Sequence, residues 1–342
     1  MKKSAVAIFP GRGTYGKDEL GYLTRYHADK GDFIAGVDQW RADLGRETIT
    51  ALDNAKTYAA SKHSSSINAS ALIYTCALAD FASINREEYD IVAVCGNSLG
   101  WYLTLAASAA LNPANAIRLV DTMGALMESE GVGGQLIYPF VDEQWRESRE
   151  RLKAISDAVH AGRTEGSAYL SIRLGGMAVL AGDEAGMAAM EKSLPKAEDR
   201  YPFRLARHAA FHTPLLQHVS DAAHNALGAQ LFNAPAIPMI DGRGAIWTPH
   251  SSDIEALHGY TLGPQIVETY DFSKSVEIAI KEFAPEKLIL AGPGSTLGAP
   301  IAQELIRHRW KGLTSKADFA AMQKADPFLI AMGRDDQRKQ VV

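Results

Sequence analysis

The sequence is poor in cysteine and carries no excess of positive charge. Only two of its 342 residues are cysteines, Cys76 and Cys95, which is too few for a disulfide framework or a tetrahedral zinc site. Both lie in apolar segments, so we expect buried, reduced thiols, as is typical of a cytoplasmic protein. The formal net charge is -5, and no basic stripe interleaved with aromatic residues is present. These features argue against binding to nucleic acid.

Long apolar runs are also missing. No segment approaches the roughly 20 apolar residues that a membrane-spanning helix needs. The opening stretch, MKKSAVAIFP, faintly resembles a signal peptide, but its apolar run ends at Pro10. That run is shorter than the roughly 7–15 residues of a signal-peptide core. We therefore expect a buried first strand here, no membrane partner and a cytoplasmic location.

The remaining composition is that of a globular protein, and its patterning indicates an α/β fold. Hydrophobic residues make up 46% of the chain and charged residues 22%. Residues 4–9 read as a buried strand, and the continuous apolar run at 90–95 (DIVAVC) indicates a parallel strand buried on both faces. A helix is expected over about 99–111. Another starts at Asn112-Pro113, a typical N-cap followed by proline.

The pattern of expected helices and strands changes between about residues 134 and 206. The expected order there is strand, helix, two strands, helix and strand, which is the βαββαβ order of a ferredoxin-like unit. The expected elements are 135–140, 142–160, 168–173, 176–181, 183–194 and 201–206. The sequence thus predicts a discontinuous large α/β subdomain (1–133 and 207–312), an inserted ferredoxin-like subdomain (134–206) and a polar C-terminal tail (313–342).

A serine between two glycines follows the strand at 90–95, in the stretch Gly96-Asn97-Ser98-Leu99-Gly100. G-x-S-x-G between a strand and a helix is the pattern of a nucleophile elbow, which exposes the serine hydroxyl at a tight turn. The start of the helix would supply free N–H groups suited to an oxyanion. The alternative is an ordinary glycine-rich turn, which the flanking strand and helix disfavour.

A serine nucleophile needs a base, and ten histidines are available. His212 stands out because it lies in Ala210-Phe211-His212-Thr213-Pro214, after an apolar approach and before a helix start. That context would hold its imidazole at the mouth of a pocket. A histidine whose ring nitrogens are satisfied by backbone groups explains the pattern equally well.

Four separated motifs together resemble the malonyl-CoA:acyl carrier protein transacylase family. They are Phe9-Pro10-Gly11-Arg12-Gly13 (FPGQG in the family), Gly96–Gly100 (GHSLG), Ala210–Pro214 (AFHSP) and Gly292-Pro293-Gly294 (GPG). Their order and spacing match over residues 4–307, and the expected insert falls where that family carries its ferredoxin-like subdomain. Ordered motifs are much more specific than any one of them.

The resemblance implies a role for each matching residue. Ser98 would be the acylated nucleophile and His212 its general base, with the backbone N–H groups of Leu99 and Arg12 forming the oxyanion hole. The family orients its histidine with a backbone carbonyl, and the matching stretch here places Asp271 at that position. Its carbonyl could act, or its side chain could complete a triad.

The resemblance also implies a ping-pong transfer. An acyl group would pass from acyl-CoA or a carrier-protein thioester to the serine, and then to the phosphopantetheine thiol of an acyl carrier protein in fatty acid or polyketide synthesis. It implies no permanently bound cofactor and no metal, and we expect a monomer.

Several positions depart from the family pattern. Arg12 replaces glutamine and brings a permanent cation near the expected acyl pocket. Asn97 replaces histidine and either lines the pocket or satisfies local backbone groups. Trp101 replaces an acidic residue and either walls the pocket or packs against the first helical turn. Phe211, beside the histidine, is also expected to line the acyl pocket.

Met123 is the departure with the largest consequence. Family members that take malonyl groups have an arginine here, within a pattern like RLVEMRG, whereas this chain reads RLVDTMG at 118–124. A thioether cannot replace a guanidinium–carboxylate pair, and an unpaired buried carboxylate costs several kcal/mol. We therefore expect an acyl group without a carboxylate, unless Arg12 reaches in to bind one. Met123 could also be a core residue.

Three other functions compete with acyl transfer. A serine hydrolase on the same framework would remove acyl groups from carrier proteins, and the loss of the malonyl-binding arginine suits it as well. A binding protein without activity is disfavoured because both Ser98 and His212 are present. An unrelated α/β-hydrolase esterase is disfavoured because no acidic residue lies at an obvious triad position between them.

Overall fold

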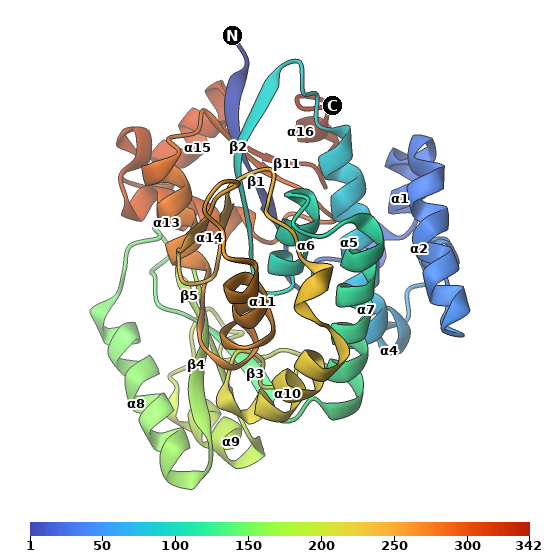
Figure 1. Ribbon diagram of the computed structural model, residues 1–342. Coiled ribbons are helices and arrows are strands. Elements are labelled where there is room, and N and C mark those ends of the chain that lie inside the picture. Colours follow the sequence, from blue (N-terminus) through green and yellow to red (C-terminus); the bar gives the residue numbers. More distant parts are fainter.

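The computed structural model describes all 342 residues, and a mostly parallel sheet forms the centre of the larger part (Figure 1). Its strand order is β11-β10-β1-β2-β7-β8. Strands β1 (Lys3–Phe9), β2 (Tyr89–Gly96), β10 (Lys287–Leu290), β11 (Leu329–Ala331) and β7 (Met239–Ile240) run parallel to their neighbours, and β8 (Ile246–Trp247) is antiparallel. Residues 5–9 of β1 are fully buried, as expected for a parallel strand covered on both faces.

Helices cover both faces of this sheet. In Figure 1, α13 (Phe272–Glu282) and α14 (Gly298–Arg307) lie on one side, and α5 (Ser66–Ser83), α6 (Gly100–Ala107) and α7 (Pro113–Glu130) lie on the other. The other helices of this part are α1 (Tyr22–Tyr26), α2 (Gly31–Asp43), α3 (Ile49–Asp53), α4 (Ala60–His63), α10 (Gln217–Ala226), α11 (Ile254–Leu262) and α12 (Pro264–Val267). None of the helices is long and apolar enough to cross a bilayer.

The inserted part has the expected βαββαβ order. It consists of β3 (Gly134–Pro139), α8 (Arg149–Glu165), β4 (Ala168–Leu174), β5 (Met177–Gly182), α9 (Glu184–Ser193) and β6 (Phe203–Arg204). The sheet order is β6-β3-β5-β4-β9, where β9 (Tyr270–Asp271) joins from the larger part. The predicted fold class, a large α/β part with a ferredoxin-like insert, is thereby confirmed. Helix α8 starts later than predicted because residues 141–147 fold into a turn closed by a bridge from Val141 to Glu147.

The prediction of a polar tail after residue 312 is wrong. This segment forms α15 (Lys316–Ala325), strand β11 and α16 (Asp335–Arg338). Strand β11 pairs with β10 and extends the main sheet, and Met332 and Val341 have no exposed surface. The apolar stretch that carries the strand is short and stands between polar helices, so its partner is visible only in three dimensions.

A buried carboxylate, Asp80 of α5, ties distant parts of the chain together. It accepts hydrogen bonds from the Tyr22 hydroxyl (2.7 Å) and the Gly292 N–H (2.7 Å), and it pairs with His27 and Arg338. A Cβ on Gly292 would lie 2.8 Å from the Pro10 ring. The Gly292–Gly294 turn therefore packs directly against the turn that follows β1.

Candidate active site

Ser98 lies at a sharp turn between β2 and α6. Its φ is 55°, a left-handed conformation that is uncommon for a residue other than glycine and often marks a functional position. A Cβ on Gly96 would lie 2.3 Å from the Gly100 carbonyl oxygen, and one on Gly100 would lie 2.3 Å from the Phe9 carbonyl oxygen. Both positions thus require glycine, and the predicted strand–serine–helix arrangement is confirmed.

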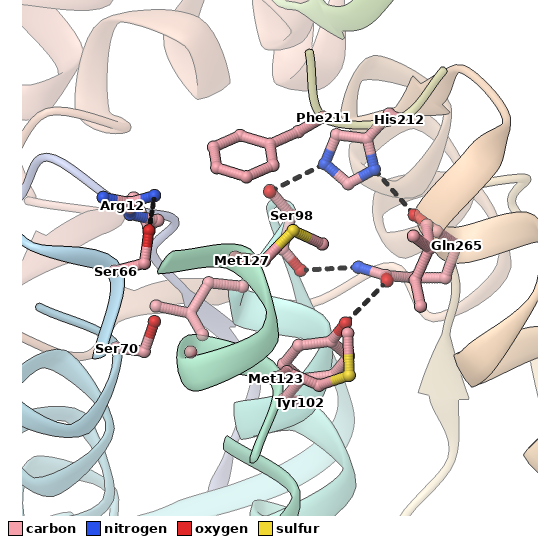
Figure 2. A pocket seen from close by; sticks show the side chains of 13 residues that line it. Arg12, Ser66, Ser70, Ser98, Tyr102, Met123, Met127, Phe211, His212 and Gln265 are labelled. Atoms are coloured by element: carbon pink, nitrogen blue, oxygen red, sulfur yellow. Dashed lines mark hydrogen bonds between the residues drawn. The ribbon is translucent and has the colours of Figure 1, made fainter. Parts of the chain in front are cut away.

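Ser98 and His212 are in direct contact, as Figure 2 shows. The distance from Ser98 Oγ to His212 Nε2 is 2.7 Å, and His212 Nδ1 lies 2.7 Å from the carbonyl oxygen of Gln265. Because a carbonyl only accepts hydrogen bonds, Nδ1 carries the proton and Nε2 is free to accept the serine proton. The imidazole is buried, and this burial lowers the pKa of His212 to about 4, against the opposing effect of the hydrogen bond to Gln265. At neutral pH the ring is therefore an unprotonated base.

The expectation that Asp271 orients the histidine is wrong. Its carboxylate accepts the Lys274 N–H and so caps α13, and it lies 3.5 Å from the Arg173 guanidinium. The orienting carbonyl belongs to Gln265 in the short helix α12, which the sequence reading missed. The Gly263-Pro264 pair that starts this helix was its only local signal.

The Gln265 side chain holds this carbonyl in place. Its Nε2 donates a hydrogen bond to the backbone carbonyl of Ser98 (3.2 Å), and its Oε1 accepts one from the Tyr102 hydroxyl (3.0 Å). Both bonds are visible in Figure 2. Gln265 thus contacts the nucleophile's own backbone as well as the base, which fixes the relative positions of Ser98 and His212.

Two backbone N–H groups beside Ser98 have no hydrogen-bond partner within the protein, those of Leu99 and Arg12. Leu99 immediately precedes α6, where the helix dipole favours negative charge. The turn containing Gly11 lies against the elbow, since a Cβ on Gly11 would be 3.6 Å from Ser98 Cβ. The two donors predicted for an oxyanion hole are therefore free and adjacent to the nucleophile.

A small cavity of about 50 Å³ adjoins Ser98 and His212. Met123 and Phe211, the two residues expected in an acyl pocket, both line it, and Met123 is only 2% exposed. The cavity also has lining residues that the sequence did not indicate, namely Ser66, Ser70, Tyr102, Gly124, Met127, Gln265 and Ile266. Its wall combines thioethers with a few hydroxyl groups.

Two of the predicted pocket residues lie elsewhere. Trp101 is fully buried, donates from Nε1 to Thr261 Oγ1 (3.0 Å) and packs edge-on against Tyr260. It therefore packs the helix and does not wall the cavity. Asn97 lines a larger cleft on the other side of Ser98, and its backbone N–H donates to the Phe9 carbonyl oxygen (3.0 Å).

Arg12 lies at the boundary between the cavity and the cleft. Its guanidinium donates to Ser66 Oγ (2.9 Å), to the Ser64 carbonyl oxygen (2.9 Å) and to the Arg207 carbonyl oxygen (3.3 Å). Burial lowers the pKa of Arg12 to about 10, and the nearby Glu128 opposes this shift. The group is thus a cation at neutral pH whose hydrogen bonds go to neutral oxygen atoms, while its Nε has no partner.

The larger cleft, of about 1070 Å³, runs from Ser98 between the two parts of the chain. One wall is formed by apolar residues of the insert, including Ile172 and Met177, and the other by residues around Thr296 and Pro300. Ser98 is itself one of the cleft's lining residues. Ser98 therefore lines both a small cavity and a much larger cleft.

Comparison with known proteins finds solved structures of the same fold. No model of a protein family and no curated protein matches the sequence. A malonyl-CoA:acyl carrier protein transacylase from Xanthomonas oryzae superposes with a TM-score of 0.77 at 18% identity, over 99% of this chain and 98% of that one. An acyl-carrier-protein S-malonyltransferase from Burkholderia pseudomallei gives a TM-score of 0.73 at 21% identity, over 95% and 100%.

A third similar structure is a malonyl-transacylase bound to the acyl carrier protein of a type II polyketide synthase. It gives a TM-score of 0.70 at 19% identity, over 96% of this chain and 94% of that one. The resemblance expected from the four motifs is thus confirmed for the fold, over the whole length of the chain.

Proposed function

We propose that this protein is an acyltransferase that carries its acyl group on Ser98 and delivers it to an acyl carrier protein. The observation that carries the proposal is the line of contacts from Ser98 Oγ to His212 and on to the Gln265 carbonyl. A hydroxyl, a neutral imidazole and a fixed acceptor in this order are what serine activation requires. The shared fold supports the same chemistry.

The reaction would proceed in two halves. His212 Nε2 takes the proton of Ser98 as Oγ bonds to the thioester carbonyl carbon, and the N–H groups of Leu99 and Arg12 receive the negative oxygen. Collapse breaks the carbon–sulfur bond, and the imidazolium returns the proton to the departing thiolate. In the second half, His212 deprotonates the incoming thiol, which attacks the ester, and Ser98 regains its proton.

The cleft would admit both the acyl donor and the acyl acceptor. Acyl-CoA and an acyl carrier protein both present the acyl group or thiol at the end of a long phosphopantetheine arm, and the cleft of about 1070 Å³ leads to Ser98. A carrier protein bound at the surface would insert this arm. In one structure of the same fold, a malonyl-transacylase is bound to its carrier protein.

We propose a short acyl group without a carboxylate. The cavity beside Ser98 holds about 50 Å³, which suits an acetyl-sized group, and Met123 occupies the wall where an arginine would bind a malonyl carboxylate. A carboxylate held by Arg12 instead is the alternative. It would have to compete with Ser66 Oγ and two backbone carbonyls for the donors of that guanidinium.

Hydrolysis of carrier-bound acyl groups is the second candidate function. The observation that favours it is the size of the cleft, because a space of about 1070 Å³ beside Ser98 admits water as well as a thiol to the ester. Transfer needs water to be excluded while the acyl-enzyme waits for its acceptor. The two functions differ in the lifetime of the acyl-enzyme.

The test is to incubate the protein with acetyl-, malonyl- and longer acyl-CoA, follow intact mass, and then add holo carrier protein. We expect one stable acetyl adduct, absent in Ser98→Ala, present in the exposed-site control Ser129→Ala, and passed on to the carrier. Rapid release of free acid would establish hydrolysis instead, and no adduct from any donor would refute both functions.

A second pair of variants tests the acyl group. We expect Met123→Arg to raise malonyl loading relative to acetyl, and Ser129→Arg, at an exposed position of the same helix α7 outside the cavity, not to change this ratio. Durable malonylation of the unaltered protein that is lost in Arg12→Gln would replace the proposal with the Arg12 alternative.

A further inference from the structure

Three hydrogen bonds connect the insert to the loop that carries His212. His208 Nδ1 lies 2.8 Å from Gln135 Oε1, Gln135 Nε2 lies 2.6 Å from Ser171 Oγ, and Ser171 Oγ lies 2.7 Å from the Phe211 carbonyl oxygen. Gln135 is on β3 and Ser171 on β4. The chain of bonds therefore leaves the loop at residue 208 and returns to it at residue 211, directly before the proposed base.

The direction of these bonds follows from the last acceptor. A carbonyl cannot donate, so the Ser171 hydroxyl uses its only proton on Phe211 and must accept from the Gln135 amide N–H. The amide oxygen then faces His208, whose Nδ1 must carry a proton. The donor and the acceptor of all three hydrogen bonds are therefore fixed.

The two side chains from the insert are deeply buried. Gln135 is 2% exposed and Ser171 is 0% exposed. The pairing of β4 with β5 shifts its register between Leu170 and Ile172, and such an irregularity re-aims the side chain that it contains. Ser171 lies at this irregularity, and its hydroxyl donates to the Phe211 carbonyl oxygen.

The loop at residues 207–212 contains two unfavourable backbone conformations that its surroundings must hold in place. Arg207 and His212 have φ values of 60° and 58°, which non-glycine residues hold only where the surroundings impose them. The peptide that joins Phe211 to His212 contains the carbonyl held by Ser171. Rotation of that peptide would move the imidazole away from Ser98 and from Gln265.

We propose that Ser171 and Gln135 are positioning residues, which hold the Phe211–His212 peptide and thereby set the reach of the His212 imidazole to Ser98. This inference rests on the proposed function. The insert would contribute to the reaction through this hydrogen-bonded chain as well as by walling the cleft. Burial, and next the charge of Arg12, lower the pKa of His208 to about 3, so His208 keeps the same protonation state near neutral pH.

The kinetic test is Ser171→Ala in single-turnover acylation of Ser98. Loss of one buried hydrogen bond to the loop should lower the rate at saturating donor about tenfold, with the half-saturating donor concentration unchanged. The matched control is Ser275→Ala, since Ser275 is equally buried and donates to the Asp241 carbonyl oxygen at the same 2.7 Å. We expect the control to lose similar thermal stability and to keep its rate.

Two further measurements separate positioning from general weakening. Gln135→Met removes both hydrogen bonds that Gln135 makes, to His208 and to Ser171, at nearly constant volume. Combining it with Ser171→Ala should give no greater loss of rate than Ser171→Ala alone, because both act through one chain. The 15N shifts of the His212 ring, which report its hydrogen bonds, should move in Ser171→Ala and not in Ser275→Ala.

The outcomes also distinguish this inference from the proposed function. If the unaltered protein takes up no acyl group, the proposed function fails, whereas the ring shifts still test the positioning. If acylation occurs and Ser171→Ala matches the control in both rate and ring shifts, the positioning role is refuted. Equal losses of rate in Ser171→Ala and Ser275→Ala would refute it as well.

Discussion

Lowering the pH should leave acylation of Ser98 unaffected until the medium is strongly acidic. The perturbation acts on His212, whose burial lowers its pKa to about 4 from an ordinary value of 6.5. Only the neutral ring accepts the serine proton. At pH 5.5, a pKa of about 4 leaves about 97% of the rings neutral, whereas a pKa of 6.5 would leave about 9%. The two cases therefore differ about tenfold in rate.

The assay is rapid quenching followed by intact mass, from pH 3.5 to 8 at saturating acyl-CoA, with circular dichroism to confirm that the protein stays folded. We expect a flat profile above pH 5 and a half-maximal rate near pH 4. A decline centred between pH 6 and 7 would refute the inference that burial keeps this base unprotonated.

The lowered pKa of His212 also affects the stability of the folded protein. A histidine whose folded pKa is lowered binds a proton more readily when unfolded, so its stabilising effect is present above pH 6.5 and is lost as the pH falls toward 4. The 2.5-unit difference corresponds to about 3 kcal/mol. Urea unfolding at pH 7 and pH 4.5 should show that His212→Gln weakens this pH dependence.

Three further changes have defined outcomes. Asp271→Ala should leave the acylation rate within about twofold and lower the free energy of unfolding by about 1 kcal/mol, since its carboxylate caps α13; a large loss of rate would restore it as the orienting residue. Gly100→Ala should abolish acylation and lower the melting temperature, because its Cβ would lie 2.3 Å from the Phe9 carbonyl oxygen, and wild-type behaviour would refute this crowding. Arg338→Met should cost about 3–5 kcal/mol in urea unfolding by removing a buried partner of Asp80; a loss below about 1 kcal/mol would show that the pair contributes little.

The parts of the site that the sequence predicted are those with a local signature. Ser98 stands between glycines at a strand–helix junction, and each of these features is visible within a few residues. His212 is marked by its neighbours in the same way. The βαββαβ order of the insert was readable because its helices and strands have distinct hydrophobic periods.

The parts that were missed depend on contacts far along the chain. Any residue offers a backbone carbonyl, so nothing in the side chain of Gln265 marks it as the partner of His212, and its helix α12 has only four residues. Strand β11 has three residues and is defined by its pairing with β10. Successive helical residues point about 100° apart, which is why Tyr102 reaches the cavity and its neighbour Trp101 does not.

The environment of Asp80 has a consequence for the order of events during synthesis. Its partners come from residues 22 and 27, from the turn at residue 292 and from residue 338. During synthesis, Arg338 is added after all the other partners. Until then the Asp80 carboxylate lacks its guanidinium partner. This part of the fold can therefore be completed only after residue 338 has been made.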